Sequence, residues 1–469
     1  MSLFAPGLVG SDRVRKINSN ASACCGDVTR CAPPSSVCVG LAIGPREFAP
    51  QPGVHDQYRV GWTSWGRGPR CGRYCEPHHV FCHHTGICGF AAGLLAIVAR
   101  AIGRNDLADA QRASRHAFTI GMGFTIVVSV LLMTLAAPIL HAAGADAEVV
   151  ALGSPFLRVA SIFTVFQTGI MLLGAVLRGA GDTRTPMVAT MVMTIIDGVG
   201  GYLLVFDVIG PGGLGLMGVA VAFSVARVVG FGYIFVAFGR RPIGWKWWRG
   251  SWMELSVFRR LIRVGGPAAA EQTMTFGGIF VTQLMALRLG TVQFATHSVI
   301  GPITSLPFTA AVGLSFAAAT SVGQCLGARR PDLARRYGVE ANAASIVMAG
   351  GFGAVMVAFP EWLMSLYTTD PSVISLGIVP LRVVGLFIFL YGPANVLPGV
   401  LRGAGDTRSA LWIAIVALWF VRVPVAFVLT FGLGMGLLGL WLALGAGYVT
   451  RVLIATWLFV RGRWQAVEV

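Results

Sequence analysis

Two acidic residues lie inside long apolar stretches of this 469-residue chain, where an ionisable side chain is costly and therefore a candidate for function. Asp197 lies in "MTIIDGVGGYLL" and Glu271 in "GGPAAAEQTMTFGG", whereas nearly all other acidic residues lie between apolar stretches or at their ends. A carboxyl group in apolar surroundings can hold a proton near neutral pH and release it when a cation arrives. The alternative is that each acid pairs with a donor on a neighbouring helix and only stabilises the packing.

Further polar residues in the second half of the chain are candidates for lining a cavity. The uncharged ones are Gln272, Gln283, His297, Tyr391 and Asn395. For each of them alone, an interhelical hydrogen bond is the more ordinary role. Arg422, in "WFVRVPVAF", is the single deep base of its apolar stretch. It either balances the charge of Glu271 or Asp197, or extends toward the membrane interface.

The composition indicates a protein that lies mostly in lipid. Hydrophobic residues make up 55% of the chain and charged residues 12%, with a mean hydropathy of +0.72, whereas soluble domains carry about 25% charged residues. From residue 117 onward, apolar stretches long enough to cross a bilayer follow one another. They cover 117–142, 152–177, 186–208, 213–238, 262–287, 295–326, 338–360, 374–400, 410–432 and 435–460. Pro267, Pro302 and Pro307 predict breaks in two of these spans.

The basic residues predict how the spans are oriented. The net charge is +16, but the arginines that supply nearly all of it are scattered between apolar blocks, which argues against a nucleic-acid groove. They fill every second loop, including 240–263 and the C-terminal end at Arg461 and Arg463, while the loops between contain none. By the positive-inside rule, the basic loops and the C-terminus are cytoplasmic.

An internal duplication organises the chain. The word "VLRGAGDTR" occurs at 176–184 and again at 400–408, which fixes an offset between two copies. The same offset relates Gly103 to Gly327, and Arg227 to Arg451. The repeat reaches from about 90 to 240 and from about 314 to 464, which corresponds to a unit of six spans. Because six is even, both copies have the same orientation in the membrane, as parallel repeats.

The duplicated word predicts a structural loop at the cytoplasmic end of one helix in each half. Its glycines permit a tight turn, and its aspartate and arginines can pair and cap helix ends. A loop that cradles phosphate is the alternative, but the strand–helix context and the GK[ST] element are missing. The loop residues are Arg178, Gly179, Gly181, Asp182 and Arg184 in the first copy, and Arg402, Gly403, Gly405, Asp406 and Arg408 in the second.

These features resemble the multidrug and toxic compound extrusion (MATE) family. The two copies of the word and the segment "THSVIGPITSLPFTAAVGLSFAAATSVGQCLGARRPDLARR" carry the resemblance, which covers about 89–464. It implies an all-α polytopic membrane protein with twelve helices in two parallel six-helix lobes, here with the first helix and most of the second missing or garbled. It also implies a multidrug exporter, not an enzyme, that exchanges organic, often cationic, compounds for inward-moving H⁺ or Na⁺ by alternating access, without a cofactor.

The resemblance bears on the two deep acids. Asp197 falls where the family places a polar residue, usually Asn, in its fifth helix, although the acid expected four residues further on is Gly201 here. Glu271 falls on the seventh helix, where some members carry an acid that takes part in cation coupling. The implied setting is a bacterial inner membrane, with a monomer in the lipid bilayer. A lipid-linked saccharide flippase of the same superfamily is the alternative, since such proteins have cationic cavity residues and Arg422 is one.

Residues 1–88 do not fit this architecture. They hold eight of the nine cysteines and five of the eight histidines, and contain no apolar run long enough to cross a bilayer. Cys71, Cys75, His78 and their neighbours are zinc-ligand types, but their spacing matches no zinc-finger pattern. A disordered tail is another interpretation. We favour a frameshift or misassigned start, because Arg-, Cys-, His-, Pro- and Trp-rich sequence is typical of GC-rich DNA read in the wrong frame, and this leaves open a truncated product that does not transport.

The predicted organisation follows from these boundaries. An irregular segment occupies 1–88, an N-terminal lobe 89–240, a cytoplasmic linker 241–261 and a C-terminal lobe 262–464. No metal site is predicted in either lobe.

Overall fold

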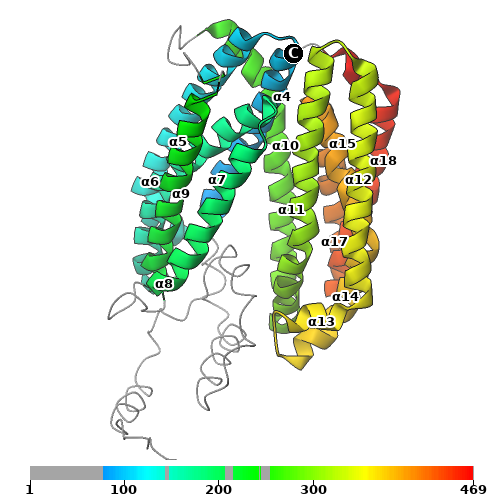
Figure 1. Ribbon diagram of the computed structural model, residues 1–469. Coiled ribbons are helices and arrows are strands. Elements are labelled where there is room, and N and C mark those ends of the chain that lie inside the picture. The colour runs from blue at the N-terminus through cyan, green and yellow to red at the C-terminus, as the bar shows by residue number, and fades with distance from the viewer. Residues whose placement is uncertain (1–77, 143–146, 206–214, 242, 245–253, 468–469) are drawn as a thin grey trace, which may run out of the picture.

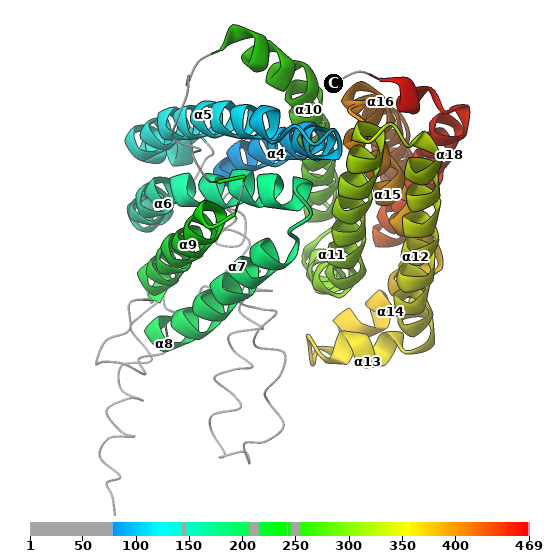
Figure 2. The same ribbon diagram turned by 45° about the horizontal axis from the view of Figure 1, so that its top comes forward.

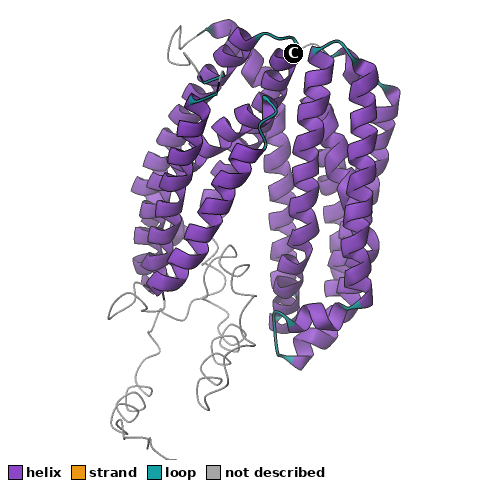
Figure 3. Ribbon diagram, viewed as in Figure 1, coloured by secondary structure: helices purple, strands orange, loops and turns teal. Residues whose placement is uncertain are grey.

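A computed structural model describes residues 78–142, 147–205, 215–241, 243–244 and 254–467, and its regular elements within these ranges are all helices (Figures 1 and 3). The first lobe consists of one set of helices packed side by side. They are α4 (His78–Gly103), α5 (Leu107–Ala142), α6 (Ala147–Gly179), α7 (Arg184–Ile195), the π-helical η2 (Ile196–Gly200), α8 (Gly201–Val205) and α9 (Gly215–Gly239). Since α7, η2 and α8 are continuous, they form one span with a π-helical turn in the middle.

The second lobe stands beside the first and has its own apolar core (Figure 1). It opens with α10 (Leu255–Leu287), α11 (Thr291–Gly327), α12 (Pro331–Ala358) and the short α13 (Pro360–Ser365). The next span joins α14 (Pro371–Phe387), η3 (Ile388–Leu390) and α15 (Tyr391–Gly403). The remaining elements are α16 (Thr407–Ala414), η4 (Ile415–Arg422), α17 (Val423–Phe427), η5 (Val428–Gly432), α18 (Leu437–Arg461) and η6 (Arg463–Ala466).

Ten stretches of the described helices are long and apolar enough to cross a membrane. Nine correspond to predicted spans, and the tenth is Gly86–Gly103 in α4. The predicted span 262–287 lies in α10, which is helical but less apolar because it carries Glu271, Gln272 and several threonines. Large apolar side chains such as Val347 and Phe420 are exposed on the outside of the bundles, as expected where lipid replaces water.

Two details differ from the sequence-based expectations. Helix α4 begins at His78, so the last part of the segment predicted as irregular is helical, whereas 1–77 lies outside the described residues. The predicted breaks at Pro267, Pro302 and Pro307 are wrong, because α10 and α11 continue through all three. A proline removes its own N–H bond and its ring crowds the carbonyl four residues earlier, but the burial of Pro307 and neighbouring residues stabilises α11 on either side.

The sequence repeat is also a repeat of backbone conformation. Asn105 and Arg329, which are equivalent in the repeat, are the two non-glycine residues with positive φ in the described chain, at 59° and 57°. Gly181 and Gly405 likewise share a left-handed conformation, at 94° and 84°. Such values favour glycine or a short polar residue, so the loops of the two lobes have kept the same turns. Two parallel repeats are therefore confirmed.

The lobes contact each other mainly through α4, which packs against α10 and α11. A Cβ atom on Gly89 would lie 2.1 Å from the carbonyl oxygen of Ala268, and one on Gly93 would lie 2.6 Å from Gly265 Cα. Figure 2 shows α4 beside α10 at this boundary. In Figure 1 the lobes meet at the end that carries the C-terminus, and separate toward α8 and α13. We call the end where they meet the closed end.

Candidate functional site

Glu271 is the centre of a buried ion-pair network in the second lobe. Its side chain is 0% exposed, and its Oε1 accepts a hydrogen bond from Arg402 Nη1 at 2.6 Å. The same oxygen lies 3.5 Å from Arg451 Nη2, and Oε2 has no hydrogen-bond partner among the described residues. One carboxylate therefore faces two guanidinium groups that come from two other helices, α15 and α18.

The position of each partner follows from its helix. The buried residues of α10 recur every three to four positions and include Val264, Ala268 and Glu271, so Glu271 belongs to the inward face of the helix. Arg402 is in the last turn of α15, and its Nη2 also donates to Ser315 Oγ at 3.2 Å. Its sequence position in the duplicated word predicted a loop role, and the structure instead directs it into the lobe.

Asp197 has a corresponding arrangement in the first lobe. It lies in the π-helical turn η2, and its carboxylate forms an ion pair with Arg227 of α9. π-helical turns are often found at functional sites because they change the direction of side chains. The Arg227 guanidinium also lies 3.6 Å above the Phe223 ring, a cation–π geometry.

Arg227 and Arg451 are equivalent in the two repeats, and each lies beside the deep acid of its own lobe. Sequence reasoning named both as a matched pair of intramembrane arginines without assigning them to the site. The signal was present, because a base at the same depth in both halves requires a partner.

The other predicted cavity residues gather in the second lobe to different degrees. Gln283 Oε1 and His297 Nε2 are 3.0 Å apart, and the His297 ring lies 5.0 Å from the Trp441 ring. Asn395 donates to the backbone oxygen of Tyr391 in its own helix. Gln272, next to Glu271, makes no hydrogen bond to another described residue.

Arg422 contacts neither deep acid. Its Nη2 lies 3.5 Å from Thr282 Oγ1, and it has no ion pair with any described carboxylate. The charges of Glu271 and Asp197 are instead balanced by Arg402, Arg451 and Arg227.

The duplicated word forms matching turns and caps at the closed end. Asp182 accepts hydrogen bonds from the N–H and hydroxyl of Thr185, and Asp406 accepts one from the N–H of Ser409. Asp182 also pairs with Arg241 at 2.6 Å. Burial raises the pKa of Asp182, but the bonds from Thr185 and the Arg241 charge outweigh it and hold the pKa below its ordinary value.

The arginines of the word have separate roles. Arg178 lies 4.9 Å above the ring of Phe316, which belongs to the other lobe, whereas Arg402 reaches Glu271. Arg184 and Arg408 make no ion pair with another described residue. The two copies of the word thus have the same backbone conformation, but their first arginines contact different residues, Phe316 for Arg178 and Glu271 for Arg402.

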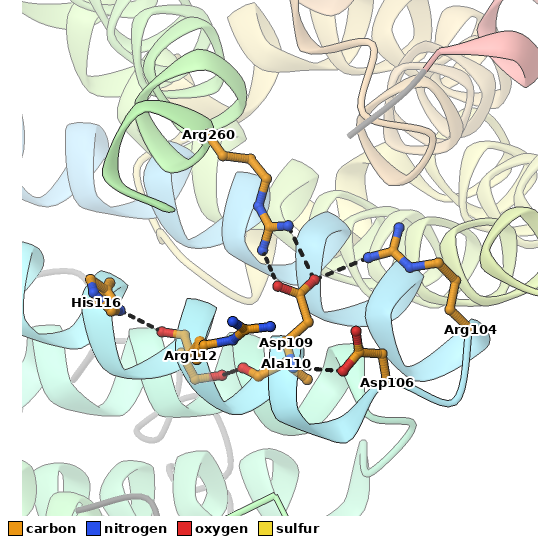
Figure 4. Close-up of polar contacts among 8 residues, drawn as sticks. Arg104, Asp106, Asp109, Ala110, Arg112, His116 and Arg260 are labelled. Atoms are coloured by element: carbon orange, nitrogen blue, oxygen red, sulfur yellow. Dashed lines mark hydrogen bonds and ion pairs between the residues drawn. The ribbon is translucent and has the colours of Figure 1, made fainter. Parts of the chain in front are cut away.

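An ion-pair cluster joins the lobes at the closed end (Figure 4). Asp109 at the start of α5 accepts two hydrogen bonds from Arg260 of α10, at 2.8 and 3.1 Å, and one from Arg104 at 3.0 Å. His116 Nε2 accepts a hydrogen bond from the Glu254 N–H at 2.8 Å. These contacts connect the beginning of α5 with the beginning of α10.

Three further hydrogen bonds cross between the lobes beside this cluster, one of them from Arg100 to the backbone oxygen of Val467. Arg100 donates to the backbone oxygen of Ala404 at 2.8 Å, and Gln324 donates to that of Gly179 at 3.0 Å. Arg100 and Gln324 are equivalent in the repeat. Each donates to a backbone oxygen of the other lobe, where a helix ends and the duplicated turn begins. The turns therefore accept hydrogen bonds that keep the closed end together.

No cluster of three metal-ligand side chains occurs in the part of the chain that the structure describes. Of the Cys- and His-rich run, Cys71 and Cys75 lie outside the described residues, and the remainder, from His78 to Cys88, lies in α4. The deep acids Glu271 and Asp197 are each paired with arginine, which is unfavourable for binding a resident metal cation.

The model of the MatE family matches residues 84–203 and 267–428. The chain belongs to the MatE family. A "Probable multidrug resistance protein NorM" from Thermotoga maritima is 31% identical over 313 residues, which are 65% of this chain and 64% of that protein. A protein of the same name from Rhizobium meliloti is 28% identical over 393 residues, 80% and 81% of the two chains.

Solved structures agree on the fold. The chain resembles "Outward-facing conformation of a multidrug resistance MATE family transporter of the MOP superfamily" with a TM-score of 0.75, 19% identity and coverage of 88% of this chain and 93% of that one. A MOP superfamily transporter from Pyrococcus furiosus gives a TM-score of 0.74 at 19% identity, over 87% and 91% of the two chains. The chain is thus a multi-pass membrane protein with the MATE architecture, and this MatE family member is a transporter rather than an enzyme.

Proposed function

We propose that this MatE family member is a secondary antiporter that exports small organic compounds from a bacterial cell across the inner membrane. Relatives named as multidrug resistance proteins support the substrate class. The alternating arginine-rich loops support a cytoplasmic C-terminus, and therefore a cytoplasmic closed end. We propose that a single chain carries out transport, since each lobe contains its own deep acid.

The observation that carries the proposal is the pairing of each deep acid with arginine. Glu271 and Asp197 each form an ion pair with an arginine on another helix. Protonation would neutralise the carboxylate and remove its attraction for arginine. The arginine charge would then be unbalanced, and loss of one partner of a buried pair costs about 3–5 kcal/mol. Helices that share such a pair would then favour a different packing, which couples proton binding to conformation.

The same geometry favours H⁺ over Na⁺ as the coupling ion. A hard metal cation prefers several oxygen ligands, whereas Glu271 offers a single unpaired oxygen beside two guanidinium groups. A proton needs only one oxygen and adds no ligand requirement. We therefore propose proton coupling at Glu271 and Asp197.

Alternating access is supported by how the lobes meet. Their polar contacts at the closed end are ion pairs and single hydrogen bonds, such as those of Asp109 and Gln324. We propose that the lobes part at this end and approach at the other when the acids change charge.

A lipid-linked saccharide flippase is the second candidate, favoured by the arginines of the second lobe. Arg402, Arg422 and Arg451 exceed the single acid there. The Pyrococcus furiosus transporter is described as having a binding pocket of reverse polarity that suggests a different function for that protein. Flipping of a labelled lipid-linked saccharide in vesicles, without dependence on an ion gradient, would favour this candidate over export of soluble compounds.

Transport in proteoliposomes tests the proposal. We expect movement of rhodamine 123 or fluorescein to follow a pH gradient and not a Na⁺ gradient, and to fall at least ten-fold in Glu271→Gln and in Asp197→Asn. Glu340→Gln is the matched control, because Glu340 is an exposed acid paired with Arg336. A response to Na⁺ alone would contradict proton coupling, and full activity of both variants would contradict the assignment of the two acids.

A further inference from the structure

The interior of the second lobe has an excess of positive charge. Glu271 is the one deep carboxylate among its described residues, and it faces Arg402 and Arg451. Arg422 is a third arginine at depth, at the end of the π-helical η4. The other described acids of this lobe are at helix ends, in loops or on exposed surface. Within the described chain Arg422 is thus left without an anionic partner, and an uncompensated charge in apolar surroundings requires one.

Several atoms of the second lobe that can donate hydrogen bonds have no acceptor among the described residues. Arg422 Nε, Tyr391 Oη and Trp441 Nε1 are all buried and have no hydrogen-bond partner among the described residues. The polar contact that Arg422 does make is the 3.5 Å approach to Thr282. Buried polar groups are almost always paired, so several unpaired donors in one lobe point to an acceptor that the protein itself does not supply.

These donors converge on one place from three spans. A Cβ atom on Gly447, the residue before Tyr448, would lie 3.1 Å from Arg422 Cβ, and the Tyr448 and Tyr391 rings are 5.2 Å apart. His297 Nε2 lies 3.0 Å from the side chain of Gln283, the neighbour of Thr282. Trp441 packs against His297. We call Thr282, His297, Tyr391, Arg422, Trp441 and Tyr448 the Arg422 site. Its aromatic rings offer an apolar wall, and its polar atoms offer mainly donors.

We propose that the Arg422 site binds an anionic group, such as a carboxylate, sulfonate or phosphate, on the organic compound that the protein transports. A guanidinium group binds such an oxyanion through two parallel N–H bonds, and the Tyr391 hydroxyl can supply a third. The Tyr391 and Tyr448 rings would pack against the apolar body of the ligand. That the bound compound is transported rests on the proposed function. Binding itself does not, because it requires no ion gradient.

The site is separate from the proposed coupling acid. Glu271 is bound by Arg402 and Arg451, and it makes no hydrogen bond with Arg422. An anion at Arg422 can therefore be accommodated without breaking the ion pairs of Glu271. A purely cationic ligand at the same place would instead meet Arg422 and Arg451 with like charge. The substrate class that the second lobe favours is an organic anion or zwitterion rather than a simple cation.

Two dyes with the same xanthene rings test this directly. Fluorescein carries a free carboxylate, and rhodamine 123 is a cationic ester, so they differ mainly in charge. With the full chain in phosphatidylcholine nanodiscs, fluorescence polarisation should show saturable binding of fluorescein, weakened at least ten-fold in Arg422→Gln and less in Arg422→Lys. Arg336→Gln, which removes an exposed arginine, should bind like the parent. Equal fluorescein affinity in Arg422→Gln, or saturable binding of rhodamine 123 alone, would overturn the proposal.

Two additions complete the design. If Arg422→Gln fails to fold, Tyr391→Phe removes a single hydroxyl and should weaken fluorescein binding several-fold, and unchanged binding there would count against the site. Phosphatidylglycerol in the nanodiscs distinguishes a lipid phosphate from a soluble anion. If phosphatidylglycerol competes with fluorescein for the parent protein, the occupant of the site is a lipid headgroup. This result would overturn the proposal that the site binds a transported anion. Because these are binding measurements, failure of gradient-driven transport would reject the antiport proposal alone.

Discussion

Gly103 and Gly327, which occupy equivalent positions in the sequence repeat, lie against each other where the two lobes meet. A Cβ atom on Gly327 would lie 3.0 Å from Gly103 Cα and 2.3 Å from the carbonyl oxygen of Arg100. A Cβ atom on Gly103 would lie 2.1 Å from the carbonyl oxygen of Gln324. Arg100 and Gln324 are also equivalent in the repeat. Gly103 therefore contacts Gln324 in the second lobe just as Gly327 contacts Arg100 in the first. Parallel repeats related by a two-fold axis require such reciprocal contacts.

The first prediction concerns this contact. Gly103→Ala and Gly327→Ala should each separate α4 from α11, because the obstructing atoms are backbone and cannot turn away. We expect a melting temperature several degrees below that of the parent protein in detergent. Gly301→Ala in the same α11 is the control, since nothing lies within 4 Å of its added methyl group and alanine favours a helix. Similar melting of Gly327→Ala and Gly301→Ala would show that the lobes do not meet this way.

The second prediction concerns Asp109 and Arg260, the bidentate pair between α5 and α10 (Figure 4). Asp109→Asn should weaken closure by about 1.5–3 kcal/mol, the range for hydrogen bonds to charged groups, and more at low salt than at high salt. Distances between spin labels on α5 and α10 would then show a larger separated population. Arg260→Gln should act in the same direction, and the exchange Asp109→Arg with Arg260→Asp should restore part of the closure. A separated population that is unchanged in both single variants would contradict the role of this pair.

Much of the architecture was predictable because membrane helices have a simple sequence pattern. Apolar length locates spans such as 338–360 and 410–432, and the offset between the two copies of the repeat predicts that Gly181 and Gly405 form the same turn. The beginning of α4 at His78 was not predictable from hydropathy, because the histidines and cysteines around it are not apolar. The continuity of α11 through Pro302 and Pro307 depends on tertiary packing, which a local rule for proline omits.

The site was predictable only in part, for a geometric reason. Depth along a span identifies Glu271 and Asp197 as unusual, but not the direction in which a long side chain from another helix points. Arg402 belongs to a polar word at a helix end, where a loop role is the ordinary one, yet its side chain extends inward to Glu271. Depth also identifies Arg422, for which charge balance and extension toward the interface were both open, and the acids are paired with other arginines.

The third prediction concerns the turn after α6. Asp182→Ala should cost about 1 kcal/mol of stability, as loss of a helix-capping oxygen does. The folded pKa of Asp182 is below its ordinary value of 3.8. Its stabilisation is therefore complete above the ordinary pKa and lost as the pH falls through the lower folded value. The difference in melting temperature between the parent and Asp182→Ala should thus shrink in strong acid. Asp182→Asn keeps a capping oxygen without a charge, so its own cap should show no such pH dependence, and a constant difference for Asp182→Ala would contradict the low pKa.

The last prediction separates Arg402 from its repeat equivalent, Arg178. Removing Arg402 leaves the fully buried Glu271 with only the longer contact to Arg451, and breaking a buried pair from one side costs about 3–5 kcal/mol. Removing Arg178 loses a cation–π contact with Phe316, worth about 0.5–2 kcal/mol. Thermal unfolding should therefore show a larger loss for Arg402→Gln than for Arg178→Gln. Adding Glu271→Gln to Arg402→Gln should recover stability, because the unpaired carboxylate is gone, and it should recover none in the Arg178→Gln background. Recovery in both backgrounds, or in neither, would mean that Arg402 does not stabilise the lobe through Glu271.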